Sequence, residues 1–209
     1  MSNSQVETYK LVASPFHLDV RGKLSMGVLG KHLLNCADAY AAERGFDVVE
    51  QGGEHYTWVL SRLAIELEDL PSCHESFSIQ TWVENVYRLF ADRNFVICNK
   101  DEKPIGYVRS VWAMISMETR NPANLLGLYG DRITNSICEK ECPIAKPGRI
   151  KVSQQEAVSE YVAKYSDLDI NGHVNSIKYI EHILDIFPLD TFKKRDLKRF
   201  EIAYVAESY

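Results

Sequence analysis

Three polar residues alternate along one short segment of the chain: Asp169, Asn171 and His173. The apolar pattern after them predicts a helix, whose first N–H groups are free and carry the positive end of the helix dipole. An acyl carbonyl oxygen placed there would be polarised as in an oxyanion hole, and Asn171 and His173 could add donors. A nearby carboxylate could orient water or act as a base. Hydrolysis of a thioester needs these elements.

Each of the three residues also has a structural interpretation. Asp169 is of a type that caps helices and closes turns. Asn171 suits the left-handed backbone of a turn, and a lone His at the start of a helix usually lies on the surface. Spacing alone therefore leaves the catalytic and the structural interpretations open.

The segment that carries these residues occurs twice in the chain. Residues 18–36 align without gaps with residues 168–186, and both share Leu-Asp-x-x-Gly at the start and His-x-Leu further on. A second match in the same context, each time after a strand-like run and before a helical pattern, indicates an internal repeat.

The two copies differ where chemistry would lie. The first copy has Arg21 and Lys23 at the positions of Asn171 and His173. Duplication followed by specialisation would give one active copy and one that shapes a pocket. We therefore expect the second copy to carry the chemistry.

The hydrophobic patterning around the repeat predicts the elements that position it. Apolar residues at helical spacing predict helices over about residues 25–44 and 174–187. A long helix on one face of an antiparallel sheet is an α+β architecture, and this order of elements is that of the hot-dog fold. β-branched and aromatic runs between polar turns predict strands at residues 9–16, 56–67, 77–86, 89–98, 105–116, 160–165 and 200–206.

The repeat predicts tandem hot-dog domains, at residues 1–118 and 152–209, joined by a linker at residues 119–151 that is rich in Pro, Asn and Gly. After its helix the second copy has one strand, whereas the first copy continues into a meander of strands. If the copies are equivalent, the second is truncated and lacks about 40–50 residues of its sheet. The alternative is that another chain completes that sheet.

The composition argues against several classes of protein. The net charge is −5, whereas general nucleic-acid binders are usually basic, so no nucleic-acid partner is expected. Cys138 and Cys142 lack the second pair of ligands that a metal site needs, and the odd, scattered set of five cysteines is a poor disulfide framework. No apolar run approaches the roughly 20 residues of a membrane span, and the N-terminus has no targeting pattern. We expect a cytoplasmic protein without a metal or cofactor.

The second copy resembles a known family. Residues 165–184, YSDLDINGHVNSIKYIEHIL, look like the SDLDxNxHVNNxKYI signature of the acyl-ACP thioesterases, with Ser176 in place of the second Asn. The resemblance continues in WVLSRLAIEL, TWVEN, Arg93 and RSVWAMISMETRNP, and covers essentially the whole chain. It implies a double hot-dog fold that hydrolyses fatty acyl-ACP to free fatty acid and acyl carrier protein.

The resemblance also implies roles for single residues. The family's catalytic Asp, Asn and His match Asp169, Asn171 and His173, and its catalytic Glu matches Glu207. Ser208 stands where the family has a Cys, so a thiol nucleophile is missing and a carboxylate-centred mechanism is favoured. In that mechanism Glu207 activates water or attacks directly, and Asp169 and His173 position the site. Asn171 and the helix N-terminus hold the thioester carbonyl.

Two further groups of residues are assigned to binding. The acyl chain, carried on phosphopantetheine, is expected to contact aromatic residues that set the depth of the pocket. Acyl carrier protein is acidic, so a basic cluster is expected to dock it. Substrate binding is assigned to Trp58, Arg62, Trp82 and Trp112, and carrier docking to Lys193, Lys194, Arg195 and Lys198.

Other functions and partners stay open on the sequence. An acyl-CoA thioesterase of the same fold would take the other common thioester carrier. A noncatalytic hot-dog protein that binds acyl groups would show no rate to lose on substitution of Asp169. A homodimer is a further open expectation, and the preferred acyl chain length is not set by the sequence.

Overall fold

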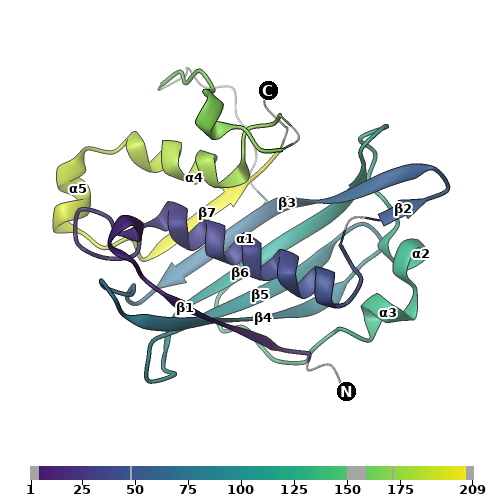
Figure 1. The fold of residues 1–209 in the computed structure, drawn as a ribbon, viewed down its shortest axis with the longest axis horizontal. Coiled ribbons are helices and arrows are strands. Elements are labelled where there is room, and N and C mark those ends of the chain that lie inside the picture. Colours follow the sequence, from purple (N-terminus) through teal and green to yellow (C-terminus); the bar gives the residue numbers. More distant parts are fainter. Residues whose placement is uncertain (1–4, 48, 150–158, 171, 206–209) are drawn as a thin grey trace.

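The structure, a computed structural model, is built on one antiparallel sheet of seven strands (Figure 1). The structure describes residues 5–47, 49–149, 159–170 and 172–205. The strands run in the order β1-β4-β5-β6-β3-β2. Strand β2 pairs with the first residues of β3, and β7 pairs with residues 62–66 nearer its end. Their bounds are β1 Glu7–Val12, β2 Val49–Gln51, β3 Glu54–Leu67, β4 Ser76–Val86, β5 Ala91–Cys98, β6 Pro104–Ser116 and β7 Arg199–Ala203.

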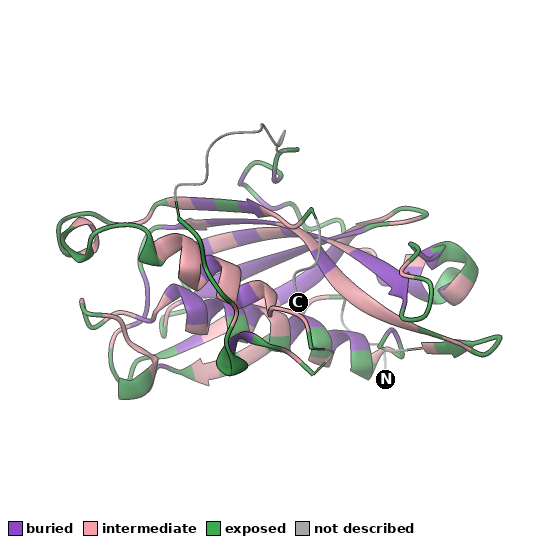
Figure 2. Ribbon diagram, turned by 90° about the horizontal axis from the view of Figure 1, so that it is seen from above, coloured by how far each residue is buried: buried purple, intermediate pink, exposed green. Residues whose placement is uncertain are grey.

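Helix α1 (Met26–Glu43) lies along one face of this sheet (Figure 1). It begins after Ser25, whose side chain accepts the Val28 N–H at 3.3 Å, and ends before Gly45, whose φ of 65° favours glycine. Figure 2 shows buried residues gathering where α1 meets the sheet. The predicted long helix on an antiparallel sheet, and with it the α+β class, is confirmed. The buried positions of α1 recur at helical spacing and include Leu29, Leu33, Cys36, Ala37 and Tyr40.

The second copy contributes helix α4 (Ser176–Asp185), which lies beside α1 (Figure 1). The two helices approach closely at Gly30, where a Cβ would lie 2.7 Å from Ile177 Cδ1. Ile177 and Ile180 are buried in the core that α1 shares with the sheet. Helix α5 (Leu189–Lys194) then leads to β7, the one strand that the described residues of the second copy form.

Two predicted strands are corrected by the structure. The strand expected at residues 9–16 ends at Val12, because Pro15 begins a short 3-10 helix, η1 (Pro15–His17). Residues 160–164 form no strand, and η2 (Tyr165–Asp167) follows them. Their counterpart β1 pairs with β4, whereas no described strand offers residues 160–164 a backbone partner.

The segment after β6 packs on both faces of the sheet. Helices α2 (Leu125–Tyr129) and α3 (Asp131–Thr134) bury Ile133 in a cluster around Phe46 and Met114. Further along, Cys142 and Ile144 pack with Trp82 in a separate cluster. The boundaries of the linker and of the two domains stay a prediction.

Candidate active site

The turn before α4 is closed by hydrogen bonds between its own residues. The Asp169 N–H donates to the His173 carbonyl oxygen at 2.8 Å, and Asp169 Oδ1 accepts the His173 backbone N–H at 3.1 Å. Gly172 donates to the Asp169 carbonyl and has a φ of 77°, a left-handed conformation that glycine adopts without strain. The Asp169 carboxylate thus shapes the turn that presents His173.

The turn before α1 has the same backbone. The Asp19 N–H donates to the Lys23 carbonyl at 2.7 Å, Gly22 donates to the Asp19 carbonyl, and the φ of Gly22 is 72°. Its charged side chains are paired: Arg21 with Asp19 at 2.8 Å, and Lys23 with Asp69 at 2.8 Å. The aspartate of each copy is therefore a turn residue, as the structural interpretation predicted.

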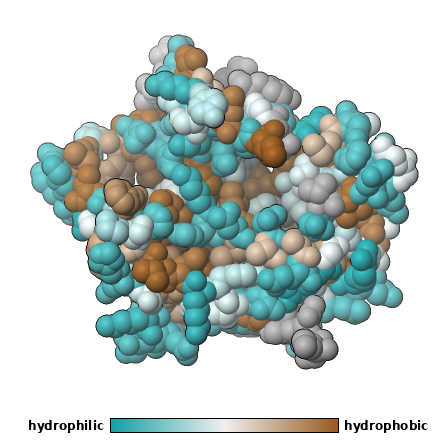
Figure 3. Space-filling model, in the orientation of Figure 1, coloured by the Kyte–Doolittle hydropathy of each residue, from teal (hydrophilic) through white to brown (hydrophobic). Residues whose placement is uncertain are grey.

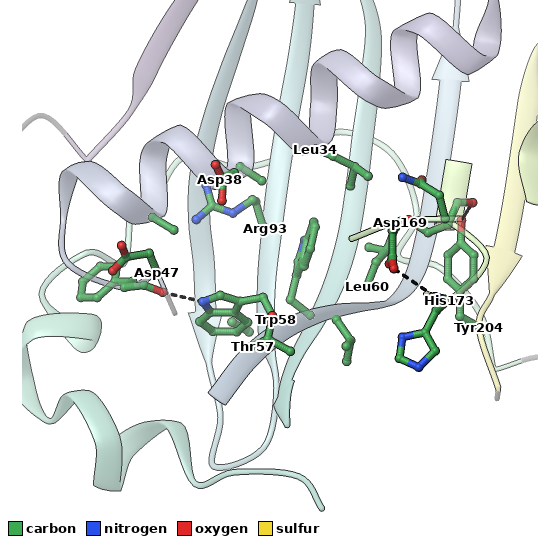
Figure 4. A pocket seen from close by; sticks show the side chains of 18 of the residues that line it. Leu34, Asp38, Asp47, Thr57, Trp58, Leu60, Arg93, Asp169, His173 and Tyr204 are labelled. Carbon is green, nitrogen blue, oxygen red and sulfur yellow. Dashed lines mark hydrogen bonds between the residues drawn. The ribbon is translucent and has the colours of Figure 1, made fainter. Parts of the chain in front are cut away.

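A cavity of about 350 Å³ opens between α1, β3 and the start of α4 (Figure 4). Figure 3 shows apolar side chains around a hollow in the face seen in Figure 1. Asp169 and His173 lie toward one end of the cavity, and Asp47 and Trp58 toward the other (Figure 4). The turn of the second copy thus meets a space that the first copy largely encloses, through Leu34, Ala37, Ala41, Phe46, Val59, Leu60, Val83, Ala91, Trp112 and Ile133.

The cavity wall also contains a buried cation. Arg93 is 8 % exposed, donates to Thr81 Oγ1 at 3.2 Å and lies 4.2 Å from the centre of the Tyr40 ring. Burial lowers the pKa of Arg93 to about 10, so the group stays charged at neutral pH. Among the described residues no carboxylate lies within 4.0 Å of the Arg93 guanidinium. Its charge is stabilised by the face of the Tyr40 ring and by the Thr81 hydroxyl.

Three residues at the start of α4 were not singled out from the sequence. Asn175 caps the helix by accepting the Ile177 N–H at 2.9 Å, and it lines the cavity. Tyr204 donates from just beyond β7 to the Ser176 carbonyl at 2.8 Å, and burial raises its pKa. Tyr179 packs edge-on against Tyr204 with 5.7 Å between ring centres. The internal repeat could have identified Asn175, because Asn175 aligns with Ser25, which caps α1.

The structure divides the residues that were predicted to bind substrate. Trp58 and Trp112 line the cavity. Trp82 is fully buried in a different cluster, and its indole N–H donates to the Lys140 carbonyl at 2.8 Å. Arg62 pairs in register with Val111, which neighbours Trp112 and so points to the opposite face of the sheet. Neither Trp82 nor Arg62 lines the cavity, so the prediction that they bind substrate there is not retained.

Two of the predicted catalytic residues, Asn171 and Glu207, lie outside the described residues. Ser208 does so as well. Their roles stay predictions, and the geometry above rests on Asp169, His173 and the residues around them.

The basic cluster predicted for docking lies on α5 and just after it, and all four side chains are exposed. Acidic residues accompany it: Lys193 pairs with Asp190 at 3.6 Å, and Lys198 with Asp196 at 3.7 Å. The surface is therefore mixed in charge, with Lys194 and Arg195 completing it.

The described part of the chain shows no cluster of three or more His, Cys, Asp or Glu side chains that could hold a metal ion. Within the same residues, no helix has the length and apolar character to cross a membrane.

Two family models match the chain, one over each half. The model of the acyl-ACP thioesterase N-terminal domain matches residues 5–129, and that of the acyl-ACP thioesterase C-terminal domain matches residues 150–209. The chain belongs to the acyl-ACP thioesterase family. The turn with Asp169 and His173 thus falls in the C-terminal domain model, and most of the cavity wall in the N-terminal one.

Similar solved structures and curated relatives are also named as thioesterases of acyl carrier protein substrates. An acyl-ACP thioesterase from Bacteroides thetaiotaomicron is 59% identical with a TM-score of 0.90, covering 98% of this chain and 83% of that one. The 12:0-ACP thioesterase from Umbellularia californica shares the fold, with 17% identity, a TM-score of 0.81 and coverage of 99% and 84%. A chloroplastic palmitoyl-acyl carrier protein thioesterase from Gossypium hirsutum is 25% identical over 83% of this chain. The chain spans 44% of that relative's length.

Proposed function

We propose that this chain hydrolyses fatty acyl-ACP thioesters to free fatty acid and acyl carrier protein. The observation that carries the proposal is the meeting of a polar turn, with Asp169 and His173, and a largely apolar cavity. Such a cavity would take the acyl chain, and its polar end would meet the thioester. Family membership supports the same reaction.

The turn geometry sharpens the proposed roles. Asp169 Oδ1 accepts the His173 N–H, and we therefore assign Asp169 the role of orienting the turn. We assign proton transfer or attack to Glu207, which matches the family's catalytic Glu, with His173 beside the thioester. The Ile177 N–H is taken by Asn175, so the helix would polarise the carbonyl through its dipole, with Asn171 as a direct donor.

The substrate carrier follows from the relatives' names and from charge. Relatives are named as acyl-carrier-protein thioesterases, and an acidic carrier would be drawn to Lys193, Lys194, Arg195 and Lys198. We place the protein in the cytoplasm. A homodimer remains part of the proposal, and Trp58 and Trp112 are retained as acyl-chain contacts.

The test is hydrolysis of a C8–C18 acyl-ACP series by this chain, with the Bacteroides thetaiotaomicron relative as positive control for the assay. Turnover by both proteins supports the proposal. Turnover by the relative and none by this chain would remove the activity and favour the noncatalytic acyl-binding alternative. Equal or higher kcat/KM on acyl-CoA of the same length would favour the acyl-CoA alternative.

Docking is tested separately by charge reversal. Lys193→Glu with Lys194→Glu should raise KM for acyl-ACP more than KM for acyl-CoA, because only the first carrier is an acidic protein. The matched control is Lys100→Glu with Lys103→Glu, two exposed lysines on the turn between β5 and β6. Equal changes for both carriers, or for both variants, would contradict docking at this cluster.

A further inference from the structure

A buried carboxylate lies directly behind the active-site turn. Asp167, the last residue of η2, is 2 % exposed. Its Oδ2 accepts the Tyr161 hydroxyl at 2.7 Å and the Lys164 N–H at 2.8 Å, and its Oδ1 lies 3.4 Å from His182 Nε2. The Tyr161 hydroxyl and the Lys164 N–H hold the pKa of Asp167 below its usual range, so the group is ionised.

The same residue is tied to both ends of the turn. The Asp167 carbonyl oxygen accepts the Asn175 N–H at 2.8 Å, and Asn175 caps α4 and lines the cavity. His182 belongs to α4, and the Tyr161 ring packs on it with 3.7 Å between ring centres. The tip of the turn adds no apolar packing, because Ile170 is fully exposed. Asp167 therefore meets the helix at two points: its carbonyl accepts the Asn175 N–H, and its carboxylate lies beside the His182 ring.

The first copy shows that the backbone of this turn does not require a carboxylate. His17 occupies the position of Asp167, and its carbonyl accepts the Ser25 N–H at 2.9 Å, as in the second copy. Its ring packs edge-on against His32, the counterpart of His182, with 5.7 Å between ring centres. A requirement of the fold would apply to both copies, so it does not explain why Asp167 is acidic.

We propose that Asp167 is a positioning residue, which through Tyr161 and His182 holds the turn bearing Asp169 and His173 in register with the start of α4. It does not touch substrate. The effect on catalysis rests on the proposed thioesterase function, whereas the effect on the turn does not. Geometry of this kind matters because displacement of a reacting group by about 1 Å can reduce a rate by about 100-fold.

The test compares Asp167→Asn with His17→Asn, the matched change in the first copy, in the full chain. Asp167→Asn should lower kcat for acyl-ACP about tenfold or more with KM changed less than about twofold. Amide hydrogen exchange of His173 and Asn175 should rise about tenfold or more. His17→Asn should leave kcat unchanged.

The outcomes separate the two proposals. Unchanged exchange at His173 and Asn175 overturns the positioning role, and so does an equal loss of kcat in both variants. Absence of turnover by the unsubstituted chain overturns the thioesterase function alone, and the exchange rates still decide the role of Asp167. If Asp167→Asn does not fold, Tyr161→Phe removes only the 2.7 Å hydrogen bond and should raise the same exchange rates.

Discussion

In the turn before α1, Arg21 pairs with Asp19 and Lys23 pairs with Asp69, whereas in the turn before α4 Asp169 and His173 line a cavity. Both turns close through an aspartate and a left-handed glycine. The aspartate and glycine thus meet the needs of the fold in both copies, whereas Lys23 forms an ion pair at the position where His173 lines the cavity.

The aspartates test this difference most strongly. Asp169→Asn should lower kcat/KM for acyl-ACP by on the order of 100-fold or more, because the turn would present His173 without its orienting carboxylate. Asp19→Asn should cost about 1 kcal/mol or less of stability, as expected for a partly exposed ion pair, and should leave kcat/KM unchanged. Steady-state kinetics and denaturant unfolding check both. Similar kinetic losses in the two variants would break the comparison.

The second prediction concerns the contact between helices α1 and α4. Gly30→Leu should lower the free energy of unfolding by about 1–3 kcal/mol, because its side chain would occupy the space of Ile177. The matched control is Asn35→Leu, at an exposed position of α1, with little expected change. Urea unfolding measures both. Equal stability of the two variants would show that α4 is not seated on α1 at Gly30.

The smallest effect is a pH dependence located in the first copy. Burial, and then His17, lower the pKa of His32, so the folded state disfavours its protonation. The unfolded chain then binds more protons below about pH 6.5, and stability should fall as pH drops from about 7 to 5. His32→Gln should flatten this slope.

A histidine with the opposite shift provides the control. The hydrogen bond to Glu118 raises the pKa of His55, whose contribution is present below the unfolded pKa and lost as pH rises through the folded one. His55→Gln should therefore leave the loss between pH 7 and 5 in place. Unfolding curves at a series of pH values test the pair, and an unchanged slope in His32→Gln would reject the assignment.

Much of the fold followed from sequence patterns because those patterns are local. The apolar stripe of α1 and the strand runs from β3 to β6 appear within a residue or two of their predicted bounds. The repeat located the turn of Asp169 before any side chain was placed. Helical and strand periodicity, together with turn chemistry, suffice for such elements.

Membership of the cavity could not be predicted in the same way, because the face of a strand depends on its pairing. A bulge between Leu60 and Arg62 shifts the alternation of β3, so that Leu60 lines the cavity and Arg62 points away. Trp58 and Trp82 look alike in sequence, yet they lie in different clusters. Tyr204 reaches α4 only through the pairing of β7 with β3.

In the proposed mechanism the second-copy turn carries the chemistry, and a pair of variants at equivalent positions distinguishes the two copies. His173→Gln and Lys23→Gln change equivalent positions of the two copies. The measurement is kcat/KM for acyl-ACP. We expect a loss of about 100-fold or more for His173→Gln and an unchanged value for Lys23→Gln. Equal values for the two variants, or a larger loss for Lys23→Gln, would contradict it.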